Sequence, residues 1–461
     1  MNIVDFTKKF QEIEIKYNFF DYKDKSGIGY WDIVRFDVFY EIYFDLTSTN
    51  TSSNIQKATS IPAKKNKIHK IKKLIEHFWS INFKTYDYIF FICSRYKNEN
   101  GVNYDASAFD LLNRLDKQSL IFETFLRAEH YLHKGIINIA PDFAKIIRKI
   151  TEGGKQYEDE HNVEDYRAMN TIISNEFNST YNFKELIKES IKRYKFEHLY
   201  YLKLFKKVMP KRIFVIQNGI QKGMFAAAAE LNIPLSEIQH GLIGYIHPTY
   251  SYPKSIKYGQ LKALPETFLS FGSFWTEHLH FPVKKYIALG NSHLSKQHPK
   301  YVSTFDITFV FADIYTDLLI GLLKELLLLG YKGKICVKLH SNQYFQSSEI
   351  ETLFSNYSNI TIITNKETIE QVLSTSQAIV AIQSTVVYQA LHSKVRVFLY
   401  KRLDYDTHFD VFDDPLVSLF DTVNQLVECI KMPTLNDLTS PKCYFETFHD
   451  DVFQKLLKNA L

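Results

Sequence analysis

Cysteine, glycine and proline are all scarce in this chain of 461 residues. The 16 glycines and 12 prolines are too few for long unstructured linkers, because such linkers are rich in these residues. The four cysteines, Cys93, Cys336, Cys429 and Cys443, lie far apart and follow no metal-ligand spacing. Cys93 and Cys336 fall in apolar, strand-like runs. We therefore expect buried free thiols in a reducing compartment.

Segments that would export the chain or anchor it in a bilayer are missing as well. Residues 1–16 mix acidic and basic side chains and lack the apolar core of a secretory signal. The longest apolar run, Leu318–Leu329, is interrupted by Lys324 and Glu325 and is too short to span a membrane. We expect this run to form a core helix, and we expect the protein to be cytoplasmic.

Neither sign of charge dominates. The 56 basic and 51 acidic residues give a net charge of +5, which is too balanced to indicate nucleic acid as a partner. Two segments, residues 64–73 and 203–212, are rich in lysine. Each indicates either a solvated helix face or a peripheral contact with the anionic inner face of the cytoplasmic membrane. The sequence has no Walker loop and no G-x-G-x-x-G, H-E-x-x-H or G-x-S-x-G motif.

Apolar and aromatic side chains, in contrast, are abundant. Apolar residues make up 45% of the chain and aromatic residues 15%, including 37 Phe and 30 Tyr. This composition supports sizeable cores and excludes a disordered chain. A chain of this length is expected to form two domains rather than one.

The stretch from Ile213 to Gly241 has the pattern of a βαβ unit. An apolar run at Ile213–Ile216 predicts a strand, Met224–Leu231 predicts a helix, and a second short strand leads into Glu237, Gln239 and His240. Ligands of parallel sheets bind beyond the carboxyl ends of the strands. We therefore expect Glu237 and His240 to supply a general base or to polarise a hydroxyl. The alternative is a buried pair satisfied by loop backbone.

Strand and helix patterns alternate over most of the chain. Tyr86–Cys93 is expected to be a buried strand, whereas residues 107–200 are largely helical in pattern. This alternation predicts parallel sheets with helices on both faces. We therefore predict an α/β fold with two Rossmann-like, doubly wound domains, residues 1–295 and 296–461, facing a central cleft.

The second predicted domain contains a candidate anion site. Its predicted strands are Asp306–Phe311, Lys334–Leu339, Ile360–Ile363, Ala378–Ile382 and Val395–Tyr400. Ser384 and Thr385 begin a predicted helix, Val386–His392, while Lys338 and His340 end an earlier strand. Hydroxyls at a helix start, with a cation and an imidazole nearby, suit a nucleotide phosphate. The alternative for the two hydroxyls is a plain helix N-cap.

A segment rich in aromatic residues follows His240. Tyr245, His247, Tyr250 and Tyr252 form a surface on which sugars commonly stack, although an amphipathic loop over a core has the same pattern. Earlier in the chain, Arg95 and Asp110 are candidates for the facing side of the cleft. Exposed loop residues would give the same weak signal.

Several of these motifs together resemble bacterial capsule and lipopolysaccharide glycosyltransferases of the GT-B fold. The resemblance rests on Glu237-Ile-Gln239-His240-Gly241, His247-Pro248, Tyr250-Ser-Tyr252-Pro253, Phe271-Gly272, Gly290-Asn291, Lys338-Leu-His340 and Ser384-Thr385, with Trp31-Asp-Ile-Val-Arg35 and Tyr104-Asp105 in the first half. It covers most of the chain and is specific for the fold rather than for a donor.

The resemblance implies roles for the candidate residues. In such enzymes the second domain holds the nucleotide sugar, here through Lys338, His340, Ser384, Thr385 and Gln389, and the first domain holds the acceptor. The acceptor residues would be Arg95, Asp110, Tyr245, His247 and Tyr250, and His240 and Glu237 would face the reacting carbon. Relatives that use UDP-sugars often carry Glu at the position of Gln389, which favours a CMP-linked, Kdo- or sialic-type donor.

We therefore expect a metal-independent glycosyltransferase without a cofactor, acting on a lipid-linked capsule or O-antigen glycan. Asp404-Tyr405-Asp406 matches the metal-binding motif of another sugar-transferase architecture, but we expect it to be a loop. Two alternatives stay open. One is a CDP-glycerol-type polyol-phosphate transferase, and the other is a non-catalytic glycan-binding assembly protein.

Overall fold

The computed structural model describes residues 1–24, 27–47, 86–94, 96–97, 102–123, 136–137, 163–216, 221–296, 304–312, 315–364, 367–402, 404–432 and 439–458. Arg95, the lysine-rich residues 64–73 and the predicted turn at Asn218-Gly219 lie outside the described residues. Of the helices within these ranges, none has both the length and the apolar character needed to cross a membrane.

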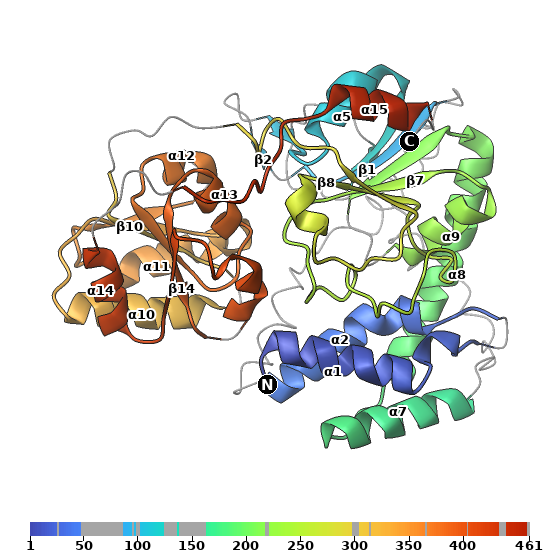
Figure 1. Cartoon of the computed structure of the whole chain (residues 1–461), viewed down its shortest axis with the longest axis horizontal. Coiled ribbons are helices and arrows are strands. Elements are labelled where there is room, and N and C mark those ends of the chain that lie inside the picture. Colours follow the sequence, from blue (N-terminus) through green and yellow to red (C-terminus); the bar gives the residue numbers. More distant parts are fainter. Residues whose placement is uncertain are drawn as a thin grey trace, which may run out of the picture. The chain divides into compact units, whose positions relative to one another are not determined.

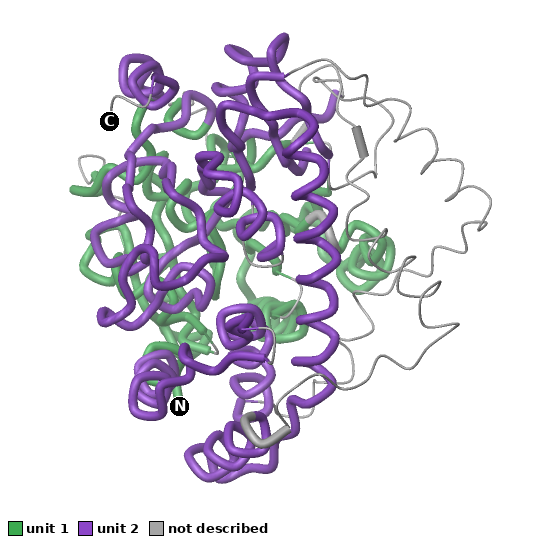
Figure 2. Tube along the Cα trace, turned by 90° about the vertical axis from the view of Figure 1, so that its right-hand side faces the viewer, with its two compact units in different colours: residues 1–5, 294–447 green, residues 6–293, 448–461 purple. Residues whose placement is uncertain are grey.

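The chain divides into two compact units, coloured separately in Figure 2. One consists of residues 6–293 and 448–461, and the other of residues 1–5 and 294–447. We call them the seven-stranded unit and the six-stranded unit, after their main sheets.

The sheet of the seven-stranded unit has the strand order β5-β4-β1-β6-β7-β8-β9, and every neighbouring pair is parallel. The strands span Tyr88–Ile92 (β1), Ser119–Glu123 (β4), Ile136–Ile137 (β5), Arg212–Ile216 (β6), Leu235–Ile238 (β7), Thr267–Ser270 (β8) and Lys285–Ala288 (β9). A separate antiparallel pair consists of β2 (Tyr96–Lys97) and β3 (Asn103–Tyr104). The central strands are buried on both faces, as expected for a parallel sheet covered by helices.

Four of the helices near this sheet cover its two faces. The helices are α1 (Ile3–Lys16, which begins in the six-stranded unit), α2 (Trp31–Thr47), α5 (Phe109–Leu115), α7 (Val163–Phe177), α8 (Lys184–Val208), α9 (Lys222–Glu230) and α15 (Asp450–Leu457). One apolar cluster joins α8 and α9 to one face, and another joins α5 and α15 to the other. In Figure 1, α15 at the end of the chain lies beside α5. The chain end therefore completes the core of the unit that contains most of the first half.

The sheet of the six-stranded unit has the order β12-β11-β10-β13-β14-β15 and is also entirely parallel. Its strands span Ile307–Val310 (β10), Ile335–Lys338 (β11), Ile360–Ile363 (β12), Ala378–Ala381 (β13), Arg396–Tyr400 (β14) and Val417–Phe420 (β15). Its helices span Thr316–Leu328 (α10), Ser347–Leu353 (α11), Ile369–Ser374 (α12), Val386–His392 (α13) and Val423–Lys431 (α14). The predicted core helix is α10, whose buried leucines pack on the sheet.

Counted along the chain, the two sheets have the orders 3-2-1-4-5-6-7 and 3-2-1-4-5-6, the second of which is the order of the doubly wound Rossmann fold. Two such units are the domain content of the GT-B fold. The predicted fold class is therefore confirmed, while the cleft between the domains stays a prediction.

Two parts of the chain differ from the sequence-based prediction. Residues 107–200, which have a largely helical pattern, also contain β4, a strand between β5 and β1 whose five residues are all buried. Residues 448–461, predicted to end the second domain, belong to the seven-stranded unit instead. The reason is that the apolar face of α15, which includes Phe453 and Leu456, packs into the core of the seven-stranded unit.

Candidate functional site

The strand order locates the edge of each sheet at which ligands bind. In a doubly wound sheet the crevice opens where the strand order reverses, outside the carboxyl ends of the strands. In the six-stranded unit this point lies between β10 and β13, and Ser384 follows β13 closely. In the seven-stranded unit it lies between β1 and β6, and His240 follows β7, the strand next to β6. His240 and Ser384 therefore lie at the sheet edges where doubly wound folds commonly bind ligands.

Glu237, Tyr250 and His240 form a chain of polar groups. Glu237 is fully buried in β7, and its Oε1 accepts a hydrogen bond from the Tyr250 hydroxyl at 2.6 Å. The same hydroxyl lies 3.5 Å from Nδ1 of His240, whose ring is partly exposed. Since the single phenol proton goes to Glu237, the oxygen presents a lone pair to His240. This arrangement favours a proton on Nδ1, so Nε2 carries the ring lone pair.

This geometry bears on the predicted role of Glu237. Its carboxylate is buried, and the Tyr250 hydroxyl lies between it and the His240 ring. Burial, and then the Glu237 charge, raise the pKa of Tyr250 well above its ordinary value. The phenol therefore keeps its proton and acts as a fixed link.

Gln239 fixes the end of β7 against β8. Its backbone N–H donates to the Leu269 carbonyl at 2.9 Å, and its Oε1 accepts from the Phe271 N–H at 2.9 Å. Its Nε2 donates to the Gly241 carbonyl at 3.0 Å. These bonds hold the loop that begins at His240, a role that the sequence did not reveal.

The loop after His240 is anchored by buried charges. The Arg35 guanidinium pairs with Glu14 at 2.5 Å and donates to the Pro248 carbonyl. Nearby, Asp32 pairs with Lys222 at 3.1 Å and accepts from the Tyr252 hydroxyl at 2.7 Å. Side chains of helices α1, α2 and α9 thus anchor this loop. Buried charges require such partners, because an unpaired buried ion is very costly.

His247 and Tyr245 differ from what an open sugar-binding surface requires. The His247 ring lies 4.8 Å from the Tyr250 ring and 6.0 Å from the Phe36 ring, and its Nδ1 accepts from the Thr249 N–H at 3.3 Å. Burial lowers the pKa of His247 to about 4. Burial also raises the pKa of Tyr245, whose side chain is partly exposed. A neutral His247 therefore packs in the loop, and Tyr245 and His247 stay predicted acceptor residues.

Asp110 anchors a neighbouring loop. It is buried, its Oδ2 accepts from the Ser292 N–H at 2.8 Å, and its Oδ1 lies 3.6 Å from Arg114. Two further carboxylates have similar roles at the end of β1. Asp105, of the Tyr104-Asp105 motif, accepts from the Cys93 N–H, and Glu123, which the sequence analysis missed, accepts from the Ser94 N–H, both at 2.8 Å.

Ser384 and Thr385 are partly exposed at the start of α13, which spans seven residues. The Ser384 hydroxyl oxygen accepts from the Val386 N–H at 3.2 Å, so the hydroxyl proton points elsewhere. The Ser384 backbone N–H donates to Nε2 of His408 at 3.1 Å. The hydroxyl of Ser384, rather than its backbone, is therefore the group suited to an anion.

His408 stabilises this turn through a hydrogen bond to the backbone. Its ring is fully buried, and burial lowers its pKa to about 3, so it stays neutral and accepts from Ser384. Close by, the Tyr315 hydroxyl contacts both Asp404 and Gln383. These contacts connect the segments that follow β10, β13 and β14. The sequence does not reveal this support, because its members are far apart along the chain.

Lys338 ends β11 and His340 follows it, one strand away from the switch point. The Lys338 ammonium donates to the Thr364 carbonyl, and the side chain is 8% exposed. Burial lowers the pKa of Lys338. His340 is exposed, and its backbone N–H donates to Gln343 at 3.0 Å. To reach a phosphate, the lysine has to exchange its carbonyl partner for the anion.

Gln389 lies beside a carboxylate. Its amide donates to Oε1 of Glu370, on α12, at 3.2 Å. Glu370 and Glu367 both contribute negative potential at Lys338. This surface thus has a carboxylate although residue 389 is not acidic.

Asp404 and Asp406 have hydrogen-bond partners within the six-stranded unit. Asp404 accepts from Tyr315, and Asp406 accepts from the Val4 N–H at 3.2 Å. Within the described ranges, no group of three or more His, Cys, Asp or Glu side chains has the arrangement of a metal site.

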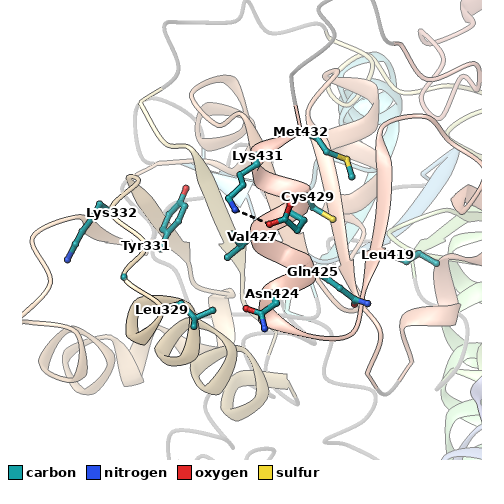
Figure 3. Close-up of a pocket in the computed structure, with 12 residues that line it drawn as sticks. Leu329, Tyr331, Lys332, Leu419, Asn424, Gln425, Val427, Cys429, Lys431 and Met432 are labelled. Carbon is teal, nitrogen blue, oxygen red and sulfur yellow. Dashed lines mark hydrogen bonds and ion pairs between the residues drawn. The ribbon is translucent and has the colours of Figure 1, made fainter.

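A groove of about 930 Å³ lies elsewhere on the six-stranded unit, between the end of α10 and α14 (Figure 3). Its lining includes Leu329, Tyr331, Leu419, Glu428 and Met432. Residues 329–332 precede β11, so this end of the groove lies at the amino ends of the strands. None of the predicted site residues lines it.

No protein-family model matches the chain, and no curated protein is detectably similar. The fold is similar to UDP-GlcNAc 2-epimerase from Methanocaldococcus jannaschii (10% identity, 81% of this chain and 99% of that one, TM-score 0.45). It is also similar to UDP-GlcNAc 2-epimerase from Neisseria meningitidis bound to UDP-GlcNAc (12%, 81% and 100%, 0.47) and to Acinetobacter baumannii MurG (10%, 75% and 90%, 0.41). At these values the likeness assigns no activity.

Proposed function

We propose that this protein is a glycosyltransferase that moves a sugar from a nucleotide sugar to a glycan acceptor. The observation that carries the proposal is the Glu237–Tyr250–His240 chain at the carboxyl end of β7. Such a chain orients an imidazole for general-base catalysis. The partly exposed Ser384 hydroxyl, at the switch point of a second doubly wound sheet, supports a phosphate-binding role for that unit.

In the proposed reaction, Nε2 of His240 takes the proton of the acceptor hydroxyl while its oxygen attacks the anomeric carbon. The bond between that carbon and the nucleotide phosphate breaks, and the electron pair leaves with the phosphate. Ser384 and His340 would stabilise the negative charge that develops on the leaving phosphate. Lys338 would also contact this phosphate after giving up its hydrogen bond to the Thr364 carbonyl. Thr385 lies at the same turn as Ser384. Gln389 with Glu370 would contact the ribose hydroxyls.

The finer assignment is part of the same proposal. Gln389 in place of a carboxylate favours a CMP-linked, Kdo- or sialic-type donor. The acceptor would be a lipid-linked capsule or O-antigen glycan at the cytoplasmic face of the membrane, contacted by the partly exposed Tyr245 and His247. Tyr250 and Asp110, predicted as acceptor residues, are buried and would act through the loops that they hold. No metal would take part.

Nucleotide binding is the first test. We expect selective stabilisation by CMP over CDP, UDP and GDP, without Mg²⁺, worth about 2.7 kcal/mol at 100 times the dissociation constant. Ser384→Ala should reduce this stabilisation. The control is Ser348→Ala, at an exposed position on α11, which should leave the stabilisation unchanged. A preference for another nucleotide would mean that the donor carries that nucleotide instead of CMP. No response to any nucleotide would contradict the proposal and favour a non-catalytic glycan-binding protein.

Catalysis is tested by transfer from the donor found in this way to membrane-extracted glycolipid. His240→Ala should lower the rate about 10²- to 10⁴-fold while nucleotide stabilisation persists. Tyr250→Phe should also lower the rate, because it breaks the link to Glu237. A normal rate in a folded His240→Ala variant would refute the role of His240. A product that gains phosphate together with a polyol would instead identify a polyol-phosphate transferase.

A further inference from the structure

Phe345 is exposed to solvent on the turn that follows His340, a residue of the proposed nucleotide site. It is 79% exposed, the largest value for any described Phe, Tyr or Trp. Isolated exposed apolar residues are common on protein surfaces, so exposure alone indicates no function. The position and the support of Phe345 are what distinguish it.

The turn that carries Phe345 is firmly anchored. It is the short helical turn Ser341–Gln346, which directly follows His340. Gln343, 2% exposed, fixes it to β11, because its backbone N–H donates to the His340 carbonyl at 2.8 Å and its Oε1 accepts from the His340 N–H at 3.0 Å. Its Nε2 also donates to the Thr316 hydroxyl at the start of α10. The exposed ring therefore extends from a fixed base.

The surroundings suit a nucleotide. Tyr344, the preceding residue, has its ring centroid 5.8 Å from the Lys338 ammonium. Only β10 separates β11 from β13, so the ends of these two strands lie about 10 Å apart at the usual strand spacing. A nucleotide with its phosphate at Ser384 would have to span a distance of this order for its base to meet the turn after β11.

We propose that Phe345 is the stacking platform for the nucleobase of the donor nucleotide. The inference rests on the proposed function and adds to it the surface on which the base lies. Every base has a flat π face, so a single phenyl ring holds the base without selecting it by hydrogen bonds. The identity of the base then has to be read by other groups.

Phe345→Ala tests the proposal directly. We expect nucleotide affinity to fall roughly 5- to 150-fold, the range measured when a base loses an aromatic partner. Affinity for ribose 5-phosphate, which has no base, should stay unchanged. Phe345→Tyr, which keeps the ring, should bind nucleotide like the unaltered protein.

Phe345→Trp supplies an optical readout. The three natural tryptophans, Trp31, Trp79 and Trp275, all lie within residues 6–293, so the new indole would be the first in the six-stranded unit. Nucleotide should quench its fluorescence, and ribose 5-phosphate should not. The matched control is Leu328→Trp, at an 82% exposed position at the end of α10, which should not respond.

The possible outcomes separate the two proposals. If the unaltered protein binds nucleotide and Phe345→Ala binds it equally well, the stacking platform is refuted while the proposed function stands. If nucleotide and ribose 5-phosphate lose affinity equally in Phe345→Ala, the ring supports the turn rather than the base, and the inference again fails. If the unaltered protein binds no nucleotide, the proposed function itself fails.

Discussion

Burial sets the protonation of the side chains around the loop that follows β7. The Tyr250 phenol keeps its proton because its pKa is raised by burial and by Glu237, while the His247 imidazole stays neutral because burial lowers its pKa to about 4. The Arg35 charge lowers the His247 pKa further. The loop therefore rests on groups that keep one protonation state near neutral pH.

At this scale His247 gives a pH prediction. Its folded pKa is below the unfolded value of about 6.5, so its contribution is complete above pH 6.5 and is lost as pH falls towards 4. His247→Asn keeps an acceptor near Thr249 but cannot titrate. Between pH 7 and 4.5 we expect the unaltered protein to lose roughly 2–3 kcal/mol more than the variant, at about 1.4 kcal/mol per pH unit. Denaturant unfolding followed by tryptophan fluorescence measures this, and equal losses would contradict it.

Among the elements, α9 determines how β6 and β7 are connected, and its position depends on one close approach to α8. A Cβ atom added at Gly223 would lie 2.6 Å from the Tyr194 carbonyl oxygen and 2.7 Å from the Glu197 Cβ. Both belong to α8, so only glycine lets the two helices come this close. The position of α9 in turn determines where β7 begins and where His240 lies.

Gly223→Ala is therefore expected to destabilise the seven-stranded unit by at least about 1–3 kcal/mol, the usual cost of overpacking, because backbone atoms cannot move aside cheaply. The matched control is Gly244→Ala in the same unit, where an added Cβ meets nothing within 4 Å. The control should change stability little. Both are measured by denaturant unfolding with tryptophan fluorescence. Similar stabilities for the two variants would show that the helices separate without cost.

Over the whole molecule, neither end of the chain stays with its sequence neighbours. Residues 1–5 belong to the six-stranded unit, where the Val4 N–H donates to Asp406 at 3.2 Å. Residues 448–461 belong to the seven-stranded unit, where Phe453 is fully buried and Arg212 donates to the Leu456 carbonyl at 3.4 Å. The chain thus leaves each unit and returns to it, and the core of the seven-stranded unit includes a distant segment.

This arrangement predicts which unit each core mutation weakens. Phe453→Ala, close in sequence to the six-stranded unit, should cost the seven-stranded unit about 3–5 kcal/mol. Its matched control is Phe420→Ala, equally buried in β15 of the six-stranded unit. Tryptophan fluorescence, which reports residues 6–293, should detect the first change and not the second. A reversed or equal response would contradict the assignment of α15.

The sequence predicted the local elements better than their connections. Ile360–Ile363 and Val386–His392 have the predicted bounds, because an apolar run and a capped helix are encoded by neighbouring residues. Strand β4 was missed because Ser119–Glu123 is short and ends in a carboxylate, which is unusual for a buried strand. The Glu123 carboxylate accepts a hydrogen bond from the Ser94 N–H. The helical pattern on either side of it concealed the strand.

For the candidate site, the sequence alone determined residue types and their positions at strand ends, because the order of strands and helices is written in the periodicity of apolar residues. Glu237, His240, Ser384 and Lys338 were predicted in this way and stay candidates. Only the tertiary structure decided that Glu237 is buried against Tyr250, that Lys338 donates to Thr364, and which groups hold the surrounding loops. The physical reason is that burial and hydrogen-bond partners depend on segments that meet only when the chain folds.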